Sequence, residues 1–248
     1  MQKQLYTITE NRLVATDTYR LVFSGGGAVD GEFVQLEIPG FYLRRPLSVC
    51  DTFEGGFMLL YKTVGQGTRA LATLPVGSKL SVLKGLGKGF DTGACKHSAL
   101  LVGGGLGAAP LYLLAKKLKA EGKKVTVVLG FNKAQEIVLE KEFRALCDGF
   151  ALATLDGSVG TQGFVTDAIK EMTDHEGHDV DYDYFYTCGP MVMMRAVCAL
   201  LLGPGEASLE ERMGCGAGFC YGCTIQTTAG PRRVCKDGPV FKKEEILW

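Results

Sequence analysis

Four cysteines near the end of the chain have a spacing that can hold a metal centre. They are Cys215, Cys220, Cys223 and Cys235, separated by four, two and eleven residues. A C-x4-C-x2-C run followed by a distant fourth cysteine is the plant-type [2Fe–2S] pattern. The glycines at positions 214, 216, 218 and 222 allow the loop to fold around a cluster and to aim backbone N–H groups at its sulfur atoms. The window therefore predicts an iron–sulfur centre.

Two other interpretations of the cysteines stay open at this point. A structural zinc site usually has two C-x2-C pairs, whereas only one pair here has that spacing. Reduced structural cysteines are the second alternative. Because the fourth cysteine follows sooner than in free ferredoxins, we expect a compact module. The scattered cysteines are predicted to be small buried hydrophobic residues: Cys50, Cys95, Cys147 and Cys198.

A glycine run and a Cys-Gly-Pro turn indicate a nucleotide site. Each lies between a predicted strand and a predicted helix, where free N–H groups and the positive helix end favour a pyrophosphate. The residues are Gly103, Gly104, Gly105 and Gly107 in the run, and Cys188, Gly189 and Pro190 in the turn. Plain turns without a ligand are the alternative. The second strand ends in Phe131-Asn132-Lys133, which has no arginine for a 2′-phosphate, so we predict NAD over NADP.

The first region of the chain carries a second set of residues suited to a dinucleotide. Basic side chains, hydroxyl groups and a glycine turn can together hold a dinucleotide phosphate. The members are Arg45, Pro46, Leu47 and Ser48, followed by Leu60, Tyr61, Lys62, Gly67 and Thr68. Solvated basic residues on a barrel surface are the alternative for this set.

The composition limits the class of protein that must position these residues. The chain has 248 residues, of which 46% are apolar and 22% charged, so extensive disorder is excluded. The 27 basic and 27 acidic residues cancel, which leaves no overall charge to attract nucleic acid or a membrane. No apolar leader or membrane span is visible, so we expect a cytoplasmic protein with free or metal-bound thiols.

The hydrophobic pattern predicts an α+β multidomain protein. Short strands at 5–9, 19–23, 32–38, 57–63 and 78–83, with a helix at 68–74, predict an antiparallel β-barrel over residues 1–94. Residues 95–203 alternate between the two element types, which predicts an α/β domain with a parallel sheet. Its strands are expected at 99–102, 125–129, 151–155 and 182–186, and its helices at 134–146, 165–172 and 191–202, beside one after the glycine run. Residues 204–248 form the predicted cysteine-loop module.

The order of these motifs resembles the ferredoxin–NADP reductase superfamily over about residues 1–203. The cysteine module narrows the likeness, because Glu210-x-Arg212-Met213-x-Cys215-Gly216 and the closing Val234-Cys235-x-Asp237-Gly238-Pro239-Val240-Phe241 resemble the electron-transfer subunits of bacterial type B dihydroorotate dehydrogenases. In the superfamily, the segments matching Arg45–Ser48, Leu60–Lys62 and Gly67-Thr68 bind FAD. The segments matching the glycine run and the Cys-Gly-Pro turn flank the nicotinamide nucleotide.

The resemblance implies a function and a set of partners. It implies FAD, a [2Fe–2S] cluster and NAD as cofactors of an electron relay in pyrimidine biosynthesis. Electrons from dihydroorotate, oxidised in a separate FMN-containing catalytic subunit, would pass through the cluster and FAD to NAD⁺. A heterotetramer of two chains of each kind is expected, and no catalytic acid or base is predicted. The alternative is the small subunit of an NADPH-linked ferredoxin or sulfide reductase, where we expect an aspartate ligand.

The same reasoning predicts a docking surface. A cluster at the end of a reductase serves another protein, so it should lie near the surface with the cysteine loop facing the partner. The apolar and aromatic members of that loop are Met213, Phe219 and Tyr221. Packing inside the module is the alternative for these side chains.

Overall fold

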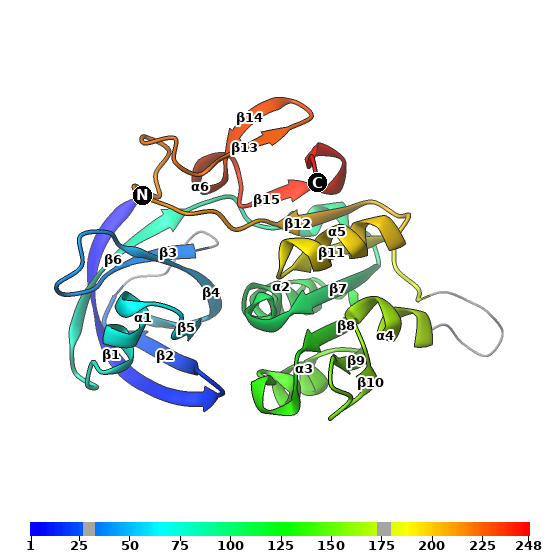
Figure 1. The fold of residues 1–248 in the computed structure, drawn as a ribbon, viewed down its shortest axis with the longest axis horizontal. Coiled ribbons are helices and arrows are strands. Elements are labelled where there is room, and N and C mark those ends of the chain that lie inside the picture. Colours follow the sequence, from blue (N-terminus) through cyan, green and yellow to red (C-terminus); the bar gives the residue numbers. More distant parts are fainter. Residues whose placement is uncertain (27–32, 173–179) are drawn as a thin grey trace. The chain divides into compact units, whose positions relative to one another are not determined.

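A computed structural model describes residues 1–26, 33–172 and 180–248 (Figure 1). The chain forms two compact units. The first comprises 1–89 with 210–240 and Leu247, and the second comprises 90–209 with 241–246 and Trp248. The cysteine segment thus falls in one unit with the N-terminal region. The division at 94 and 203 into three domains stays a prediction.

The described part of the first unit contains a closed antiparallel barrel of six strands in the order β1-β2-β5-β4-β3-β6. The strands are β1 (Gln2–Ala15), β2 (Thr18–Ser24), β3 (Phe33–Glu37), β4 (Arg45–Phe53), β5 (Gly56–Lys62) and β6 (Lys79–Leu86). This confirms the predicted barrel. Strand β4 was not expected from the pattern, and Glu32, the predicted start of β3, lies outside the described residues.

Aromatic side chains fill the barrel interior. The Tyr6 and Phe23 rings each lie 5.0 Å from Phe57, one edge-on and the other stacked. Burial of these rings and their edge-on and stacked packing stabilise the barrel. Helix α1 (Gln66–Ala72) follows β5 and confirms the helix expected near this position.

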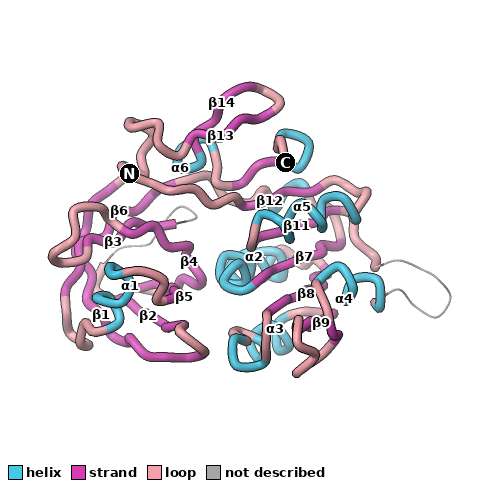
Figure 2. The backbone as a smooth tube through the Cα atoms, viewed as in Figure 1, coloured by secondary structure: helices cyan, strands magenta, loops and turns pink. Residues whose placement is uncertain are grey.

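The second unit holds a sheet of seven described strands in the order β10-β9-β8-β7-β11-β12-β15. Figure 2 labels its central strands β9, β8, β7, β11 and β12. They are β7 (Ser98–Gly104), β8 (Lys124–Phe131), β9 (Gly149–Thr154), β10 (Thr161–Gln162), β11 (Tyr184–Cys188), β12 (Gly205–Ser208) and β15 (Val240–Lys242). The pairs from β10 through β12 are parallel, as predicted. The short strands β10, β12 and β15 add to the four expected ones.

Helices connect these strands, and one of them differs from the prediction. They are α2 (Ala108–Ala120), α3 (Glu140–Leu146), α4 (Val165–Glu171) and α5 (Met191–Leu200). The single helix expected over 134–146 is wrong: a short 3-10 turn, Ala134–Glu136, precedes α3, and Leu139 between them has φ of 61°. The break between the turn and α3 places the side chains of Val138 and Leu139 in the core.

The cysteine segment forms a loop, a hairpin and a short helix. The hairpin strands are β13 (Thr224–Thr227) and β14 (Gly230–Arg233), and helix α6 (Val234–Asp237) follows directly. Gly238–Pro239 is a cis peptide bond, and Lys88 donates its backbone N–H to the Gly238 carbonyl at 2.7 Å. This bond attaches the segment to the end of β6 within the first unit. In the described part of the chain, no helix is long and apolar enough to cross a membrane.

Candidate cofactor sites

Three of the predicted flavin residues meet where Arg45, at the start of β4, lies against the first turn of helix α1. A Cβ placed on Gly67 would lie 2.5 Å from the Arg45 Nε and 2.6 Å from one terminal nitrogen of that guanidinium. The absence of a side chain at position 67 therefore lets the Arg45 guanidinium lie against the first turn of α1. The Arg45 guanidinium carbon also lies 5.1 Å from the centre of the Phe41 ring, in cation–π geometry.

Thr68 organises the turn that leads into α1. Its hydroxyl oxygen accepts hydrogen bonds from the backbone N–H groups of Val64 and Gly65, at 3.1 and 3.2 Å. It also lies 3.2 Å from the Gly65 carbonyl, to which it donates. Thr68 is itself buried, so it shapes the glycine turn and presents the backbone around Gly67. The structure thus brings Arg45, Gly67 and Thr68 together.

The other predicted flavin residues divide between a surface and a core. Pro46, Leu47 and Ser48 are half-buried along β4. Leu60 and Tyr61 on β5 are 5% and 1% exposed, and Lys62 is half-buried.

The Tyr61 hydroxyl has a structural partner inside the barrel unit. It donates to Asn11 Oδ1 at 2.9 Å, and the Asn11 amide donates in turn to the Leu71 and Leu74 carbonyls at the end of α1. Burial raises the pKa of Tyr61 well above its usual range. The Tyr61 side chain therefore supports α1.

The two predicted nucleotide motifs pack directly against each other. Strands β7 and β11 are parallel neighbours, with Gly103 opposite Cys188. A Cβ on Gly107 would overlap the Cys188 carbonyl, and a Cβ on Gly189 would lie 2.9 Å from the Gly104 backbone nitrogen. Glycine is thus required at both positions because two backbone segments meet there, and Gly189 also has φ of 149°.

The position of these motifs in the sheet is the usual ligand position in α/β folds. From β7 the chain proceeds to β8 and β9 on one side, and β11 lies on the other side of β7. Ligands of open α/β sheets bind at the carboxyl ends of strands where the order reverses in this way. Gly105, with φ of 54°, begins the turn into α2, whose first N–H groups face this edge.

The neighbouring strand ends support the same site. The Thr187 hydroxyl donates to the Val102 carbonyl at 2.9 Å, which links β11 to β7 just before their ends. At the end of β8, the Asn132 amide donates to Glu136. The Ser158 hydroxyl lowers the pKa of Asp156, and Lys133 contributes further, so an acidic group already lies near the one lysine of the Phe131-Asn132-Lys133 segment.

The four predicted cluster cysteines lie as two pairs. The Cys235 backbone N–H donates to the Cys223 Sγ at 3.4 Å, and burial together with the Cys223 thiol raises the pKa of Cys235 to about 12. Cys215 and Cys220 interact through their side chains. Among the described residues, no three cysteine, histidine or acidic side chains are clustered as ligands of a single metal ion. Two thiol pairs are the donor set of a two-iron centre, in which each iron takes two thiolates.

The cysteine loop stabilises the thiolate form of its first member. The Cys215 Sγ accepts backbone N–H groups from Ala217 at 3.4 Å, Phe219 at 3.2 Å and Cys220 at 3.4 Å. Burial opposes ionisation, but these donors outweigh it and lower the pKa of Cys215 to about 6. Iron binds the thiolate, so the loop fits an iron–sulfur cluster by its donor chemistry.

Arg233 holds the cysteine loop to the segment that carries Cys235. Its guanidinium donates to the Gly218 carbonyl at 2.9 Å and pairs with Asp237 at 3.1 Å. The guanidinium carbon also lies 4.9 Å from the Tyr221 ring centre. Sequence reasoning missed this residue. The only sequence signal is its position directly before Val234-Cys235 with an acidic residue four positions on.

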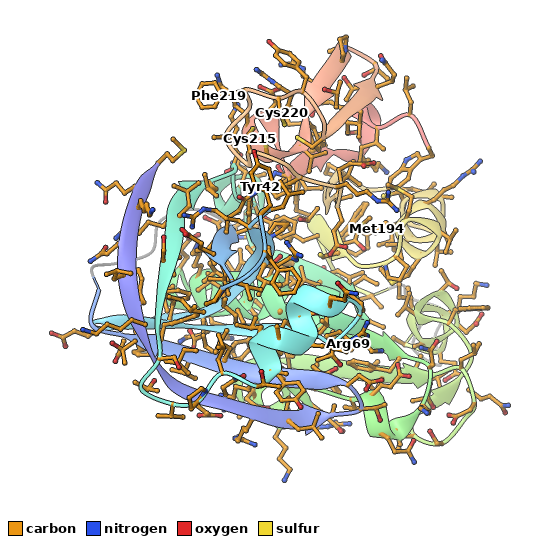
Figure 3. All side chains as sticks on the ribbon, turned by 60° about the vertical axis from the view of Figure 1, so that its left-hand side comes forward. Tyr42, Arg69, Met194, Cys215, Phe219 and Cys220 are labelled. Carbon is orange, nitrogen blue, oxygen red and sulfur yellow. The ribbon has the colours of Figure 1, made fainter. Side chains whose placement is uncertain are left out.

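The cysteine loop extends from the interior of its unit to the surface. Cys223 and Cys235 are 2% exposed, Cys215 is half-buried, and Cys220 is exposed. Figure 3 shows Phe219 projecting outward from the loop that carries Cys215 and Cys220. The side chains of Phe219 and Tyr221 are 76% and 64% exposed, whereas Met213 is half-buried.

Comparison with known proteins agrees with this arrangement. Residues 210–247 match the iron–sulfur cluster binding domain of dihydroorotate dehydrogenase B, and residues 101–199 match an oxidoreductase NAD-binding domain. A solved structure of an NADH-dependent reduced ferredoxin–NADP oxidoreductase superimposes with a TM-score of 0.88 at 30% identity, covering 99% of this chain and 90% of that one. The fold and sites therefore define a ferredoxin-reductase-like oxidoreductase with an added iron–sulfur module.

Curated relatives specify the family further. The electron transfer subunit of dihydroorotate dehydrogenase B (NAD(+)) from Fusobacterium nucleatum is 37% identical over 97% of this chain and 96% of its own length. The same subunit from Bacillus cereus strain Q1 is 39% identical over 100% and 99%. The chain belongs to the family of electron transfer subunits of NAD⁺-dependent dihydroorotate dehydrogenase B.

Family membership confirms several predictions made from the sequence. The chain is an oxidoreductase subunit that transfers electrons to NAD⁺ in pyrimidine biosynthesis, and its cofactors are FAD, a [2Fe–2S] cluster and NAD. The word subunit in the relatives' names implies a partner that carries the catalytic site. The individual residues assigned to each cofactor stay predictions.

Proposed function

We propose that this chain receives electrons from dihydroorotate oxidised in a separate FMN-containing subunit and delivers them as hydride to NAD⁺. A flavin exchanges single electrons with an iron–sulfur cluster and hydride with nicotinamide, so the bound cofactors supply the redox chemistry. The observation that carries the proposal is the cysteine loop, with two buried thiols and Cys220 exposed at the surface. An iron–sulfur centre held there can exchange electrons with another protein.

We assign the cofactors to residues as follows. Arg45 binds a phosphate of FAD beside Gly67, and Pro46–Ser48 with Leu60–Lys62 and Thr68 form the rest of that site. The backbone of the glycine run and of Cys188–Pro190 binds the nicotinamide nucleotide, since both segments end neighbouring parallel strands. Cys215 with Cys220 and Cys223 with Cys235 bind the two irons. No side chain is assigned as an acid or base.

The exposed aromatic side chains of the cysteine loop provide the partner surface in this proposal. Phe219 and Tyr221 are exposed, which favours docking over packing within the module, and the half-buried Met213 borders them. Large exposed aromatic side chains are common anchors of protein interfaces. We propose a heterotetramer of two chains of each kind. We place the complex in the cytoplasm, a compartment in which thiols stay reduced and can bind iron.

Co-expression with the catalytic subunit tests the assembly. Size-exclusion chromatography with light scattering should give one species with the mass of two plus two chains. Phe219→Asp should shift the chains to separate elution, while Leu13→Asp, at an exposed leucine on β1, should leave the complex intact. Separate elution of the unmodified subunits would contradict the proposed assembly. An intact complex with Phe219→Asp would contradict the proposed docking surface.

The reductase alternative predicts a different ligand set. We expect an aspartate ligand in the small subunits of NADPH-linked ferredoxin or sulfide reductases, whereas four cysteines are present here. The likeness to the solved NADH-dependent ferredoxin–NADP oxidoreductase covers nearly the whole chain. The curated relatives at 37% and 39% identity are named as dihydroorotate dehydrogenase subunits, which favours the first proposal.

A further inference from the structure

Gln35 is a buried glutamine whose side-chain amide has no partner in the described structure. It lies in the middle of β3 and is 0% exposed. Neither its Nε2 nor its Oε1 makes a hydrogen bond with another described residue. Buried amides are almost always hydrogen-bonded, so this group is expected to have a partner that the described residues do not provide.

The Gln35 amide lies against the cysteine loop. A Cβ placed on Gly216 would overlap the Gln35 Nε2 and lie 2.5 Å from the amide carbon. Gly216 also has φ of 65°, so both the backbone conformation and the amide require glycine there. Gly216 directly follows Cys215, the cysteine whose sulfur accepts three backbone N–H groups.

Phe33, on the same face of β3, lies near the place where the cysteine segment joins the barrel. Phe33 lies two residues before Gln35 and therefore projects to the same side of the strand. A Cβ on Gly87 would lie 2.9 Å from the Phe33 ring and 2.7 Å from Pro239. The Phe33 ring and Pro239 of the cysteine segment thus both lie beside Gly87.

Gln35 also lies beside the predicted flavin strand. In the β3–β4 ladder it is opposite Pro46, and its carbonyl accepts from the Arg44 guanidinium at 3.4 Å. Its side chain, however, contacts the loop at Gly216. The Gln35 amide therefore contacts the segment predicted to hold the iron–sulfur centre, and only its backbone lies beside the predicted FAD strand.

We propose that Gln35 donates a side-chain N–H to a sulfur atom of the iron–sulfur centre and raises its reduction potential. The inference rests on the proposed cluster site. Reduction adds negative charge to the cluster, so a hydrogen bond to sulfur stabilises the reduced form more than the oxidised form. Gln35 is a positioning and tuning residue here, because it donates a hydrogen bond to the centre and is not an iron ligand.

Two measurements on the purified, reduced protein test this inference. With glutamine labelled by ¹⁵N in the side chain, pulsed EPR should detect a ¹⁵N coupling to the reduced cluster. The coupling should disappear in Gln35→Met, which keeps length but has no donor, and persist in Gln226→Met, at an exposed glutamine on the hairpin strand β13. In redox titrations, Gln35→Met should shift the cluster midpoint to more negative values and leave the flavin midpoint unchanged.

The possible results separate the inference from the assignment it depends on. An intact cluster signal without ¹⁵N coupling in the unmodified protein would overturn the role of Gln35, and that experiment needs no variant to fold. A shift of the flavin midpoint alone, or no shift, would overturn it as well. A protein that binds no iron would overturn the cluster assignment itself, and the role of Gln35 with it.

Discussion

Arg45→Ala should weaken FAD binding while leaving the barrel folded. The Arg45 guanidinium lies against Gly67 at the start of α1 and over the Phe41 ring, and the Arg45 residue is half-buried. A hydrogen bond to a charged group contributes about 1.5–3 kcal/mol. At about 1.4 kcal/mol per factor of ten, removal of the guanidinium should raise the Kd for FAD roughly 10- to 150-fold.

The assay is a fluorescence titration of the apoprotein with FAD. Arg45→Lys should recover part of the affinity, because it keeps the charge but not the planar group that donates two parallel hydrogen bonds. Gly67→Ala should also weaken binding, since its methyl group would lie 2.5 Å from the guanidinium. Arg12→Ala, at an arginine whose side chain is 59% exposed, is the matched control and should bind FAD normally. Unchanged affinity in Arg45→Ala would refute the assignment.

Three further predictions concern the other sites. Cys220→Ala should lose iron and the reduced-state EPR signal. The control variant Cys198→Ala should keep both. Normal EPR signals in single variants of all four cluster cysteines would reject the ligand set. NADH should give a higher kcat/KM than NADPH in a diaphorase assay, because the end of β8 offers one lysine and no arginine. A higher kcat/KM for NADPH would contradict the predicted preference for NAD. Burial raises the pKa of Glu206 to about 7, so its contribution to stability is complete below pH 4.5 and is lost as pH rises through 7. That pKa shift corresponds to roughly 3 kcal/mol of stability. Between pH 5 and 8 the thermal midpoint should therefore fall less in Glu206→Gln than in the unmodified protein. An equal fall in both proteins would refute this prediction.

The sequence predicted features that depend on local pattern. Alternating apolar residues identified most barrel strands, and the glycine motifs marked two turns that the fold brings together at β7 and β11. Strand β4 was not predicted because it begins with Arg45-Pro46 and its apolar and polar residues alternate poorly. Its formation depends on pairing with β3 and β5, which is a tertiary effect. Short strands such as β12 and β15 carry too few residues to show a period.

The cysteine site shows a similar limit. The spacing indicated which thiols could act together, because three of the four lie in one loop. The roles of Arg233 and Gln35 could not be predicted, since each depends on a contact with the loop, at Gly218 or Gly216, that the fold creates. A lone glutamine in an apolar strand has no distinguishing pattern until its neighbours are known.

Anaerobic mixing of dihydroorotate with the reconstituted complex tests the central claim most directly. The FAD of this chain should lose its oxidised absorbance in the absence of NAD⁺, and NADH should form at the same site when NAD⁺ is added. The Cys220→Ala variant should block both steps and still accept hydride from NADH at its FAD. If dihydroorotate reduces the partner's flavin while the FAD of this chain stays oxidised, the proposed relay is wrong.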